Sequence, residues 1–266
     1  FADYHPLSIL YLHLFPFEDG VHAAVRLLCS LFSVLGCLMA ATLIYTLYVD
    51  GSPFRLELLT PWMKTTLVDF YVNVAALSVW VFYKESNWFA SMLWVILFVC
   101  FGSVATCAYI VVQCFNLSPP ESSHDFIYCI MLPHRNKDAK EQQIKFPSLL
   151  AFQVLFSILG CTMFGILVYT LCTDGSPFRK ELLTPWMMAL LIDFYINVAA
   201  LSVWVAYKES SWINALIWIL LLVCFGSITT CVYIVGHLFR ASAQDPPYAV
   251  LLNGGSRQVG RNLEFS

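Results

Sequence analysis

The sequence predicts an all-α, polytopic membrane protein with six transmembrane helices, arranged as two three-helix repeats of inverted topology. The first observation is composition: the 266-residue chain is 59% hydrophobic and only 12% charged, whereas a soluble domain carries about 25% charged residues. Its mean hydropathy is +0.73. The second observation is that six apolar segments reach the roughly 20 residues needed to cross a bilayer. The third is an internal duplication that relates the last three segments to the first three.

The duplication is strongest between residues 50–85 and 174–209, which align without a gap at an offset of 124. All but seven of the 36 aligned positions are identical, and the exceptions are 56, 64, 65, 66, 68, 72 and 82. The first helices of the two copies match at only 11 of 23 positions and the third helices at 14 of 28. Folding or function therefore restrains the middle of both copies more strongly than its flanks.

The chain is expected to begin with an interfacial segment, because its first 25 residues are too interrupted by proline, histidine and acidic residues to span. Two apolar repeats follow, separated by a polar linker and ended by an irregular tail. The predicted boundaries are 1–25 for the N-terminal segment, 26–115 for repeat 1 (helices 26–49, 61–83 and 88–115), 116–148 for the linker, 149–239 for repeat 2 (helices 149–173, 185–207 and 212–239) and 240–266 for the tail.

Three crossings per repeat would make the second repeat start on the side where the first one ended, because the polar linker has only a short apolar run. The two repeats would then cross in opposite senses, related by a pseudo-two-fold axis in the membrane plane. Under this arrangement the 14 Lys and Arg residues divide seven against seven between the two sides. The positive-inside rule therefore gives no orientation.

Each copy of the duplicated stretch opens with a turn and a helix start. Thr before Pro is a good N-cap, and Pro at the first helical position lacks only an N–H that would be unpaired anyway. Arg and Glu in the same short loop predict a local ion pair. We interpret this helix-start and loop motif as architecture, with a functional loop as the alternative. Its residues are Asp50, Arg55, Glu57 and Thr60, and in the second copy Asp174, Arg179, Glu181 and Thr184.

An acidic residue lies eight positions into the second helix of each repeat, and an asparagine follows one turn later. Asp69 with Asn73, and Asp193 with Asn197, form the candidate intramembrane polar site. An acid at membrane depth costs about 2.5–3.5 kcal/mol on insertion scales, and usually faces protein or a water-filled cavity. In inverted repeats the two carboxylates would approach near the midplane, where one would keep its proton or both would share a cation. The alternative is that each acid only accepts local hydrogen bonds that join helices.

Several functional classes find no support in the residue pattern. No nucleophile–base pair, phosphate-binding loop or Cys/His cluster is visible, so we expect no enzyme, no catalytic residue, no metal and no cofactor. The net charge of -3 and the lack of a basic run argue against nucleic acid as a partner. Most of the ten cysteines lie in apolar segments, where cysteine acts as a small apolar residue. The expected partners are the lipid bilayer and other membrane-protein subunits.

The repeated motif D-G-S-P-F-R-x-E-L-L-T-P-W-M, followed by D-F-Y-x-N-V-A-A-L-S-V-W-V-x-Y-K-E-S, resembles that of a plant family of multi-pass integral membrane proteins of unknown function. The resemblance covers residues 26–239. It implies a plant source and a membrane location, for which an organellar membrane such as that of the chloroplast is one candidate. It implies no activity, substrate or catalytic residue.

Two functional hypotheses follow. The first is a non-catalytic structural subunit or scaffold of a larger membrane complex, in which the repeats form a platform while the linker and both ends contact partners. The second is a transporter- or channel-like protein that moves an ion or small solute between the repeats. The scaffold is slightly favoured, because an Asp pair alone is weak evidence for transport. In addition, many transporters have spanning helices broken by Gly or Pro, and no such break is visible here.

Overall fold

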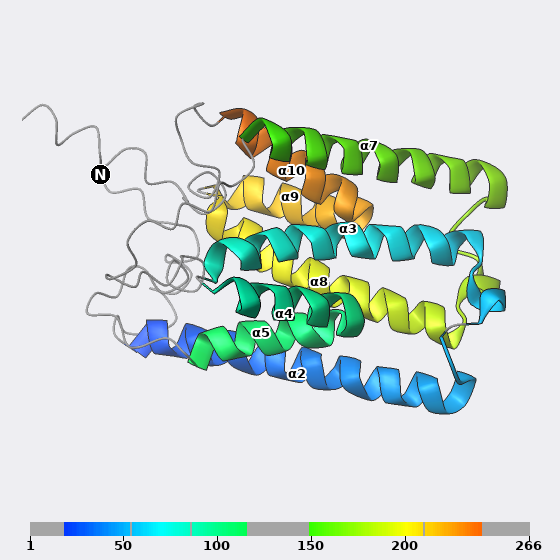
Figure 1. Ribbon diagram of the computed structural model, residues 1–266, viewed down its shortest axis with the longest axis horizontal. Coiled ribbons are helices and arrows are strands. Elements are labelled where there is room, and N and C mark those ends of the chain that lie inside the picture. The colour runs from blue at the N-terminus through cyan, green and yellow to red at the C-terminus, as the bar shows by residue number, and fades with distance from the viewer. Residues whose placement is uncertain (1–18, 54, 86, 116–148, 210, 241–266) are drawn as a thin grey trace, which may run out of the picture.

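The computed structural model describes residues 19–53, 55–85, 87–115, 149–209 and 211–240 (Figure 1). These residues form helices without any strand. The helices of repeat 1 are α2 (Asp19–Asp50), the 3-10 helix η1 (Leu56–Leu58), α3 (Pro61–Lys84), α4 (Trp88–Phe101) and α5 (Ser103–Phe115). Those of repeat 2 are α7 (Leu149–Asp174), the 3-10 helix η2 (Lys180–Leu182), α8 (Pro185–Lys208), α9 (Trp212–Phe225) and α10 (Ser227–Arg240).

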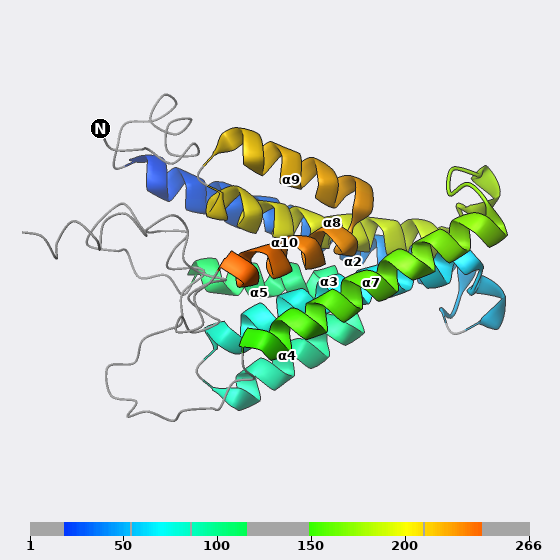
Figure 2. The ribbon, with the colours of Figure 1, turned by 90° about the horizontal axis from the view of Figure 1, so that it is seen from above.

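Each repeat contains two long helices followed by a helical hairpin. In repeat 1, α2 and α3 run in opposite directions along the bundle. Helix α4 then enters beside α3, stops part of the way along it, and α5 returns to the end from which α4 came (Figure 1). In repeat 2, α7 to α10 copy this path. Figure 2 shows both hairpins from above, with their tips inside the length of the bundle.

Glycine forms the tip of each hairpin. Gly102 has φ 55° and ψ -131°, and Gly226 has φ 54° and ψ -128°. Backbone of this kind is open to glycine and costly for residues that carry a Cβ. Because the chain reverses at these glycines, the prediction of single continuous helices over 88–115 and 212–239 is wrong. Each of these segments is two short helices.

The hairpins also overturn the inverted topology. Since each hairpin returns to its own side, a repeat crosses the bundle twice, and the second repeat starts in the same sense as the first. Accordingly, the first residues of α2 (dark blue) and of α7 (bright green) lie at the same end of the molecule in Figure 1. The six predicted spans reduce to four helices long and apolar enough to cross a membrane: Val25–Asp50, Pro61–Phe82, Leu150–Asp174 and Pro185–Lys208. Such parallel repeats are related by an axis along the membrane normal.

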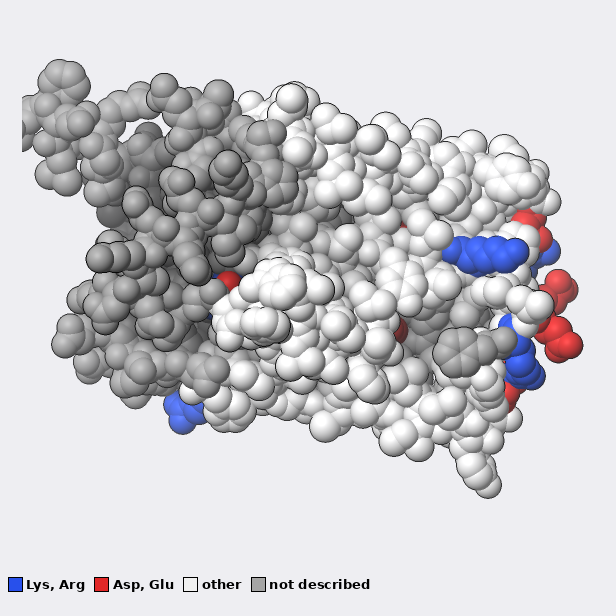
Figure 3. Space-filling model, viewed as in Figure 1, with Lys and Arg blue, Asp and Glu red and all other residues white. Residues whose placement is uncertain are grey.

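Helices α3 and α8 form the centre of the bundle. In each of these two helices, half of the residues in the most apolar stretch are buried. The corresponding shares are 11% in α2 and 17% in α7. Helix α2 packs against α5 and α8, and α7 packs against α10 and α3, so each outer helix joins its own hairpin to the other repeat. The face of the bundle drawn in Figure 3 is apolar along its length, and a group of charged side chains lies at the end formed by the loops after α2 and α7. This apolar band indicates a membrane protein in contact with lipid.

Helix α2 begins at Asp19, so residues 19–25 of the predicted interfacial segment belong to the first helix. The rest of that segment, the linker 116–148 and the tail from 241 lie outside the described residues.

The corrected topology changes how the positive residues divide between the two ends. We call the end formed by the loops after α2 and α7 the loop end, and the opposite end the linker end. The loop end has Arg55, Lys64, Arg179 and Lys180, and the helices that terminate at the linker end carry Arg26, Lys84, Lys208 and Arg240. Because these positive residues are equal in number at the two ends, the positive-inside rule still gives no orientation for the described residues.

The position of both loops at one end can be measured with a membrane-impermeant maleimide in intact cells or organelles. Cysteines introduced singly at Ser52 and at Ser176, in the exposed loops after α2 and α7, should react from the same side of the membrane. Labelling of the two positions from opposite sides would contradict the described topology.

Candidate functional site

The predicted acids lie inside the bundle and each binds the hairpin of the other repeat. Oδ1 of Asp69, on α3, accepts a hydrogen bond from the backbone N–H of Ser227 at 2.7 Å. Oδ1 of Asp193, on α8, accepts one from the backbone N–H of Ser103 at 2.6 Å. The two serines are the first residues of α10 and α5. The contacts therefore cross between the repeats in both directions.

This arrangement suits the physics of a helix start inside a membrane protein. The first N–H groups of a helix have no partner within it, and the helix dipole places partial positive charge there. A carboxylate supplies both the acceptor and the opposite charge. The glycine before each serine makes room for it: a Cβ on Gly226 would lie 2.9 Å from Oδ1 of Asp69, and one on Gly102 would lie 2.8 Å from Oδ1 of Asp193.

The predicted approach of the two carboxylates near the midplane depended on inverted repeats, and this premise does not hold. Both acids lie eight residues after the loop end of their helices, about 12 Å along the axis at 1.5 Å per residue, and so at the same depth. The structure binds each carboxylate to the backbone of a hairpin. The alternative prediction, hydrogen bonds that join helices, describes these contacts, although the donor is backbone N–H rather than a neighbouring side chain.

The two asparagines are fully buried, with 0% exposure each. Oδ1 of Asn73 accepts a hydrogen bond from Oγ1 of Thr230 at 2.8 Å, again across the repeats. Nδ2 of Asn73 and both side-chain polar atoms of Asn197 have no partner in the described part of the protein. Buried polar atoms of this kind call for a water or an ion as partner.

The helix-start and loop motif lies away from these acids, at the loop end. The predicted N-caps are confirmed: Oγ1 of Thr60 accepts from the N–H of Met63, and Oγ1 of Thr184 from that of Met187, each at 3.2 Å.

The predicted partners of the loop arginines were wrong. Arg55 pairs with Asp50, and Arg179 pairs with Asp174 at 2.8 Å. Glu57 and Glu181 lie in the exposed 3-10 helices η1 and η2 instead. An ion pair that closes the five-residue turn after a long helix supports the architectural interpretation of the motif.

Sequence reasoning missed a second pair of acids at the linker end. Glu85, just after α3, accepts hydrogen bonds from the Tyr109 hydroxyl at 2.9 Å and from Nε2 of Gln113 at 2.8 Å. Glu209, just after α8, accepts from the Tyr233 hydroxyl at 2.9 Å and has Nε2 of His237 at 3.4 Å. The usable signal was the spacing of four between Tyr and Gln or His, which places both side chains on one helical face.

The lysines before these glutamates are buried rather than snorkelling. Lys84 is 5% exposed and Lys208 is 7% exposed. Nζ of Lys208 lies 5.8 Å from the ring centroid of Trp204, a distance at which a cation is attracted to the ring face. The linker end of each repeat thus gathers an acid, a base and aromatic rings in a partly buried cluster.

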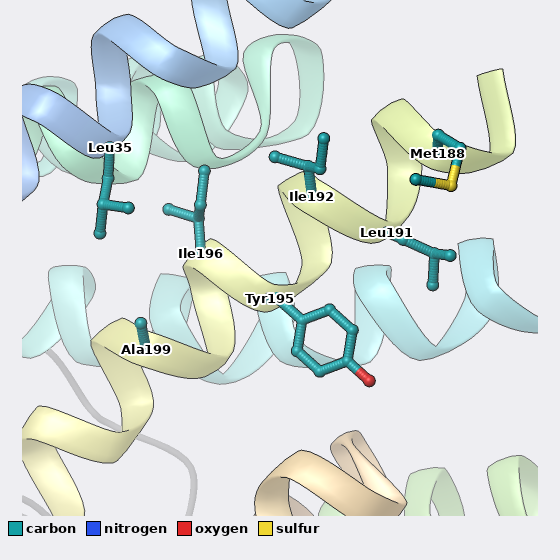
Figure 4. Close-up of a pocket in the computed structure, with 7 residues that line it drawn as sticks. All are labelled: Leu35, Met188, Leu191, Ile192, Tyr195, Ile196 and Ala199. Carbon is teal, nitrogen blue, oxygen red and sulfur yellow. The ribbon is translucent and has the colours of Figure 1, made fainter. Parts of the chain in front are cut away.

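A groove of about 420 Å³ lies between α2 and α8 (Figure 4). It is lined by Leu35, Met188, Leu191, Ile192, Tyr195, Ile196 and Ala199. These side chains are apolar apart from the Tyr195 hydroxyl, and the groove includes none of the acids or asparagines. Its lining suits the hydrocarbon of a lipid and not a polar solute. Among the described residues, no group of three or more His, Cys, Asp or Glu side chains could hold a metal ion.

Comparison with known proteins gives a family and no function. A family model described as "Protein of unknown function (DUF1475)" matches residues 20–258. No curated protein matches the chain. No solved structure matches it.

Proposed function

The chain belongs to the DUF1475 family, whose function is unknown, and we propose that it is a transporter- or channel-like membrane protein that moves a cation. The observation that carries this proposal is the pair of half-helices, α5 and α10, which begin inside the bundle against an acid of the other repeat. Discontinuous helices line the substrate and ion sites of many transporters, where their N-termini attract negative groups, here the two carboxylates. The proposal involves no catalytic step and no cofactor.

The charge of each acid is linked to the position of a hairpin. An ionised Asp69 holds the first turn of α10 through a charge-assisted hydrogen bond. A proton or metal cation that binds the carboxylate weakens its attraction for the helix start, because less negative charge then faces the dipole. Movement of a hairpin against the other repeat would thereby couple to occupation of the site.

The available ligands favour a proton or a hard cation. The ligating atoms of this region are oxygens, namely the two carboxylates, the Asn73 amide and the Thr230 hydroxyl that donates to it. Such oxygens suit hard cations and protons, whereas soft metals prefer sulfur and imidazole. The buried cysteines nearest the acids, Cys107 and Cys231, already pack against Gly36 and Gly160.

The experiment compares ion flux into proteoliposomes for the wild-type protein and for the Asp69→Asn and Asp193→Asn variants. Asparagine caps a helix nearly as well as aspartate, so the fold should be kept while the charge is lost. Losing a contact worth about 1.5–3 kcal/mol to the ion lowers its binding roughly ten- to hundredfold. We expect a fall in flux of that order in each variant. Wild-type flux in both variants would remove the acids from any transport role.

The second candidate is the scaffold, and one observation favours it. Both carboxylates already accept a hydrogen bond from protein backbone, as a structural joint between the repeats requires. A scaffold predicts a partner subunit that co-purifies in mild detergent from native membranes, and no flux for any ion. Asp→Asn substitution should leave that assembly intact, because the caps remain. Recovery as a lone protein that conducts ions would exclude the scaffold.

A further inference from the structure

Polar side chains follow one face of α10 from its first residue to its last turn. Ser227, Thr230, Tyr233 and His237 are separated by three, three and four residues, the spacing of a single helical face. They extend over ten residues, or about 15 Å at 1.5 Å per residue. We call these four residues the α10 polar stripe. It joins the interior of the bundle to the linker end.

The inner end of the stripe meets the candidate site. The Ser227 N–H donates to Asp69, and the Thr230 hydroxyl donates to Asn73. Ser227 is 0% exposed and Thr230 is 2% exposed. Nδ2 of Asn73 has no partner among the described residues. A water or hydronium ion beside the Asp69 carboxylate would satisfy this group.

The outer end of the stripe meets Glu209. The Tyr233 hydroxyl donates to this carboxylate at 2.9 Å, and Nε2 of His237 lies 3.4 Å from it. The side chains of His237 and Glu209 keep 22% and 14% exposure, whereas Tyr233 is 2% exposed. An imidazole and a carboxylate therefore stand where the buried stripe reaches the linker end.

We propose that the α10 polar stripe is the route by which protons travel between the linker end and Asp69. This inference rests on the proposed transport function and names the proton as the transported or coupling ion. His237 takes a proton from solution at its imidazole and passes it to the Glu209 carboxylate, which regenerates neutral imidazole. A chain of waters along Tyr233 and Thr230 then transfers one proton to the Asp69 carboxylate, and Glu209 becomes ionised again. Only O–H and N–H bonds form and break, and one proton moves in total.

The first repeat provides a matched comparison within the same molecule. The equivalent face of α5 carries Ser103, Thr106, Tyr109 and Gln113. Glu85 accepts from Tyr109 and from the Gln113 amide, so this stripe ends in an amide that does not titrate. The two stripes otherwise use the same residue types. The stripe of α5 should therefore deliver protons to Asp193 more slowly than that of α10 delivers them to Asp69.

Among the described residues, the charges around His237 come from few elements. Glu209 and Lys208 stand at the end of α8, and Arg240 follows on α10. Helix α9 contributes no acidic or basic residue, and the acid of α7, Asp174, lies at the loop end. Helix α3 contributes Asp69 at the inner end of the stripe and Lys84 at the linker end. Glu209 is thus the acid in contact with His237.

The first test measures proton uptake by proteoliposomes with an enclosed pH-sensitive dye. His237→Gln gives α10 the residue that α5 carries at the equivalent position. A positioned group that carries protons speeds proton transfer by about a hundredfold or more, so we expect the rate of uptake to fall by at least about tenfold. Gln113→His is the matched control and should keep or raise the wild-type rate. If His237→Gln takes up protons at the wild-type rate while Asp69→Asn does not, the α10 polar stripe is not the proton route. The proposed transport function would remain in place.

The second test does not depend on transport. Dicyclohexylcarbodiimide enters from lipid and modifies protonated carboxyl groups, and peptide mass spectrometry then quantifies the product at each acid. After an acid step applied on the linker-end side, Asp69 should be modified faster than Asp193, and His237→Gln should remove this difference. Equal modification of Asp69 in wild type and variant would refute the stripe, even if no flux is found and the proposed function fails.

Discussion

Replacing Gly226 by Ala is expected to destabilise the protein by about 2–6 kcal/mol, since backbone strain and overpacking each cost about 1–3 kcal/mol. The residue has φ 54°, which a residue with a Cβ adopts at a cost. The new Cβ would also lie 2.7 Å from Cζ of Phe194 and 2.9 Å from Oδ1 of Asp69. Phe194 belongs to the central core, so the ring has little room to move. Gly102→Ala should act in the same way on the first hairpin.

The measurement is the thermal unfolding midpoint of the purified protein in detergent. Gly165→Ala is the matched control, because a Cβ there has no neighbour within 4 Å and the residue lies inside helix α7. Ala is a better helix former than Gly by about 1 kcal/mol, so the control should unfold at the wild-type midpoint or above it. A midpoint for Gly226→Ala equal to that of Gly165→Ala would mean that the hairpin tip does not have the described geometry.

The hairpin tips are the feature of the fold that the sequence analysis did not predict. The apolar run at residues 88–115 has 28 residues, which as one helix would measure about 42 Å, well beyond a bilayer core of about 30 Å. This excess, together with F-G-S in its middle, was a usable signal for a break. Hydropathy alone did not reveal it, because two short apolar helices and one long helix have the same composition. A single missed reversal in each repeat then inverted the predicted topology.

Local features were predictable, and contacts between distant segments were not. The helix starts at Pro61 and Pro185 and their threonine caps depend on residues a few positions apart, and they agree with the structure. The partial burial of Asp69 and the full burial of Asn73 also followed from their place in an apolar helix. Their partners lie 158 and 157 positions away in the chain, and no periodicity specifies such pairs. Glu85 and Glu209 were missed for the same reason.

The crossed contacts change what the duplication means physically. If each Asp bound the hairpin of its own repeat, either half could move as a closed unit. Instead the α3 acid binds α10 and the α8 acid binds α5, while α2 packs on α8 and α7 packs on α3. Neither hairpin can then leave its site without breaking a contact with the other repeat. This coupling between the repeats is required by an alternating mechanism and is equally suited to a rigid platform.

Replacing Asp69 by Ala should therefore destabilise repeat 2 more than repeat 1. The substitution leaves the Ser227 N–H buried without an acceptor, which costs about 1–3 kcal/mol, whereas Asp69→Asn should cost less than about 1 kcal/mol because Asn remains an N-cap acceptor. Amide hydrogen exchange followed by mass spectrometry should show faster exchange in the first turn of α10, with α5 unchanged. Asp193→Ala should give the reverse, with faster exchange at the start of α5. Protection from exchange should be lost at the N–H group that lost its acceptor. The crossed contacts would therefore be contradicted if the faster exchange appeared in the hairpin of the mutated repeat and not in that of the other repeat.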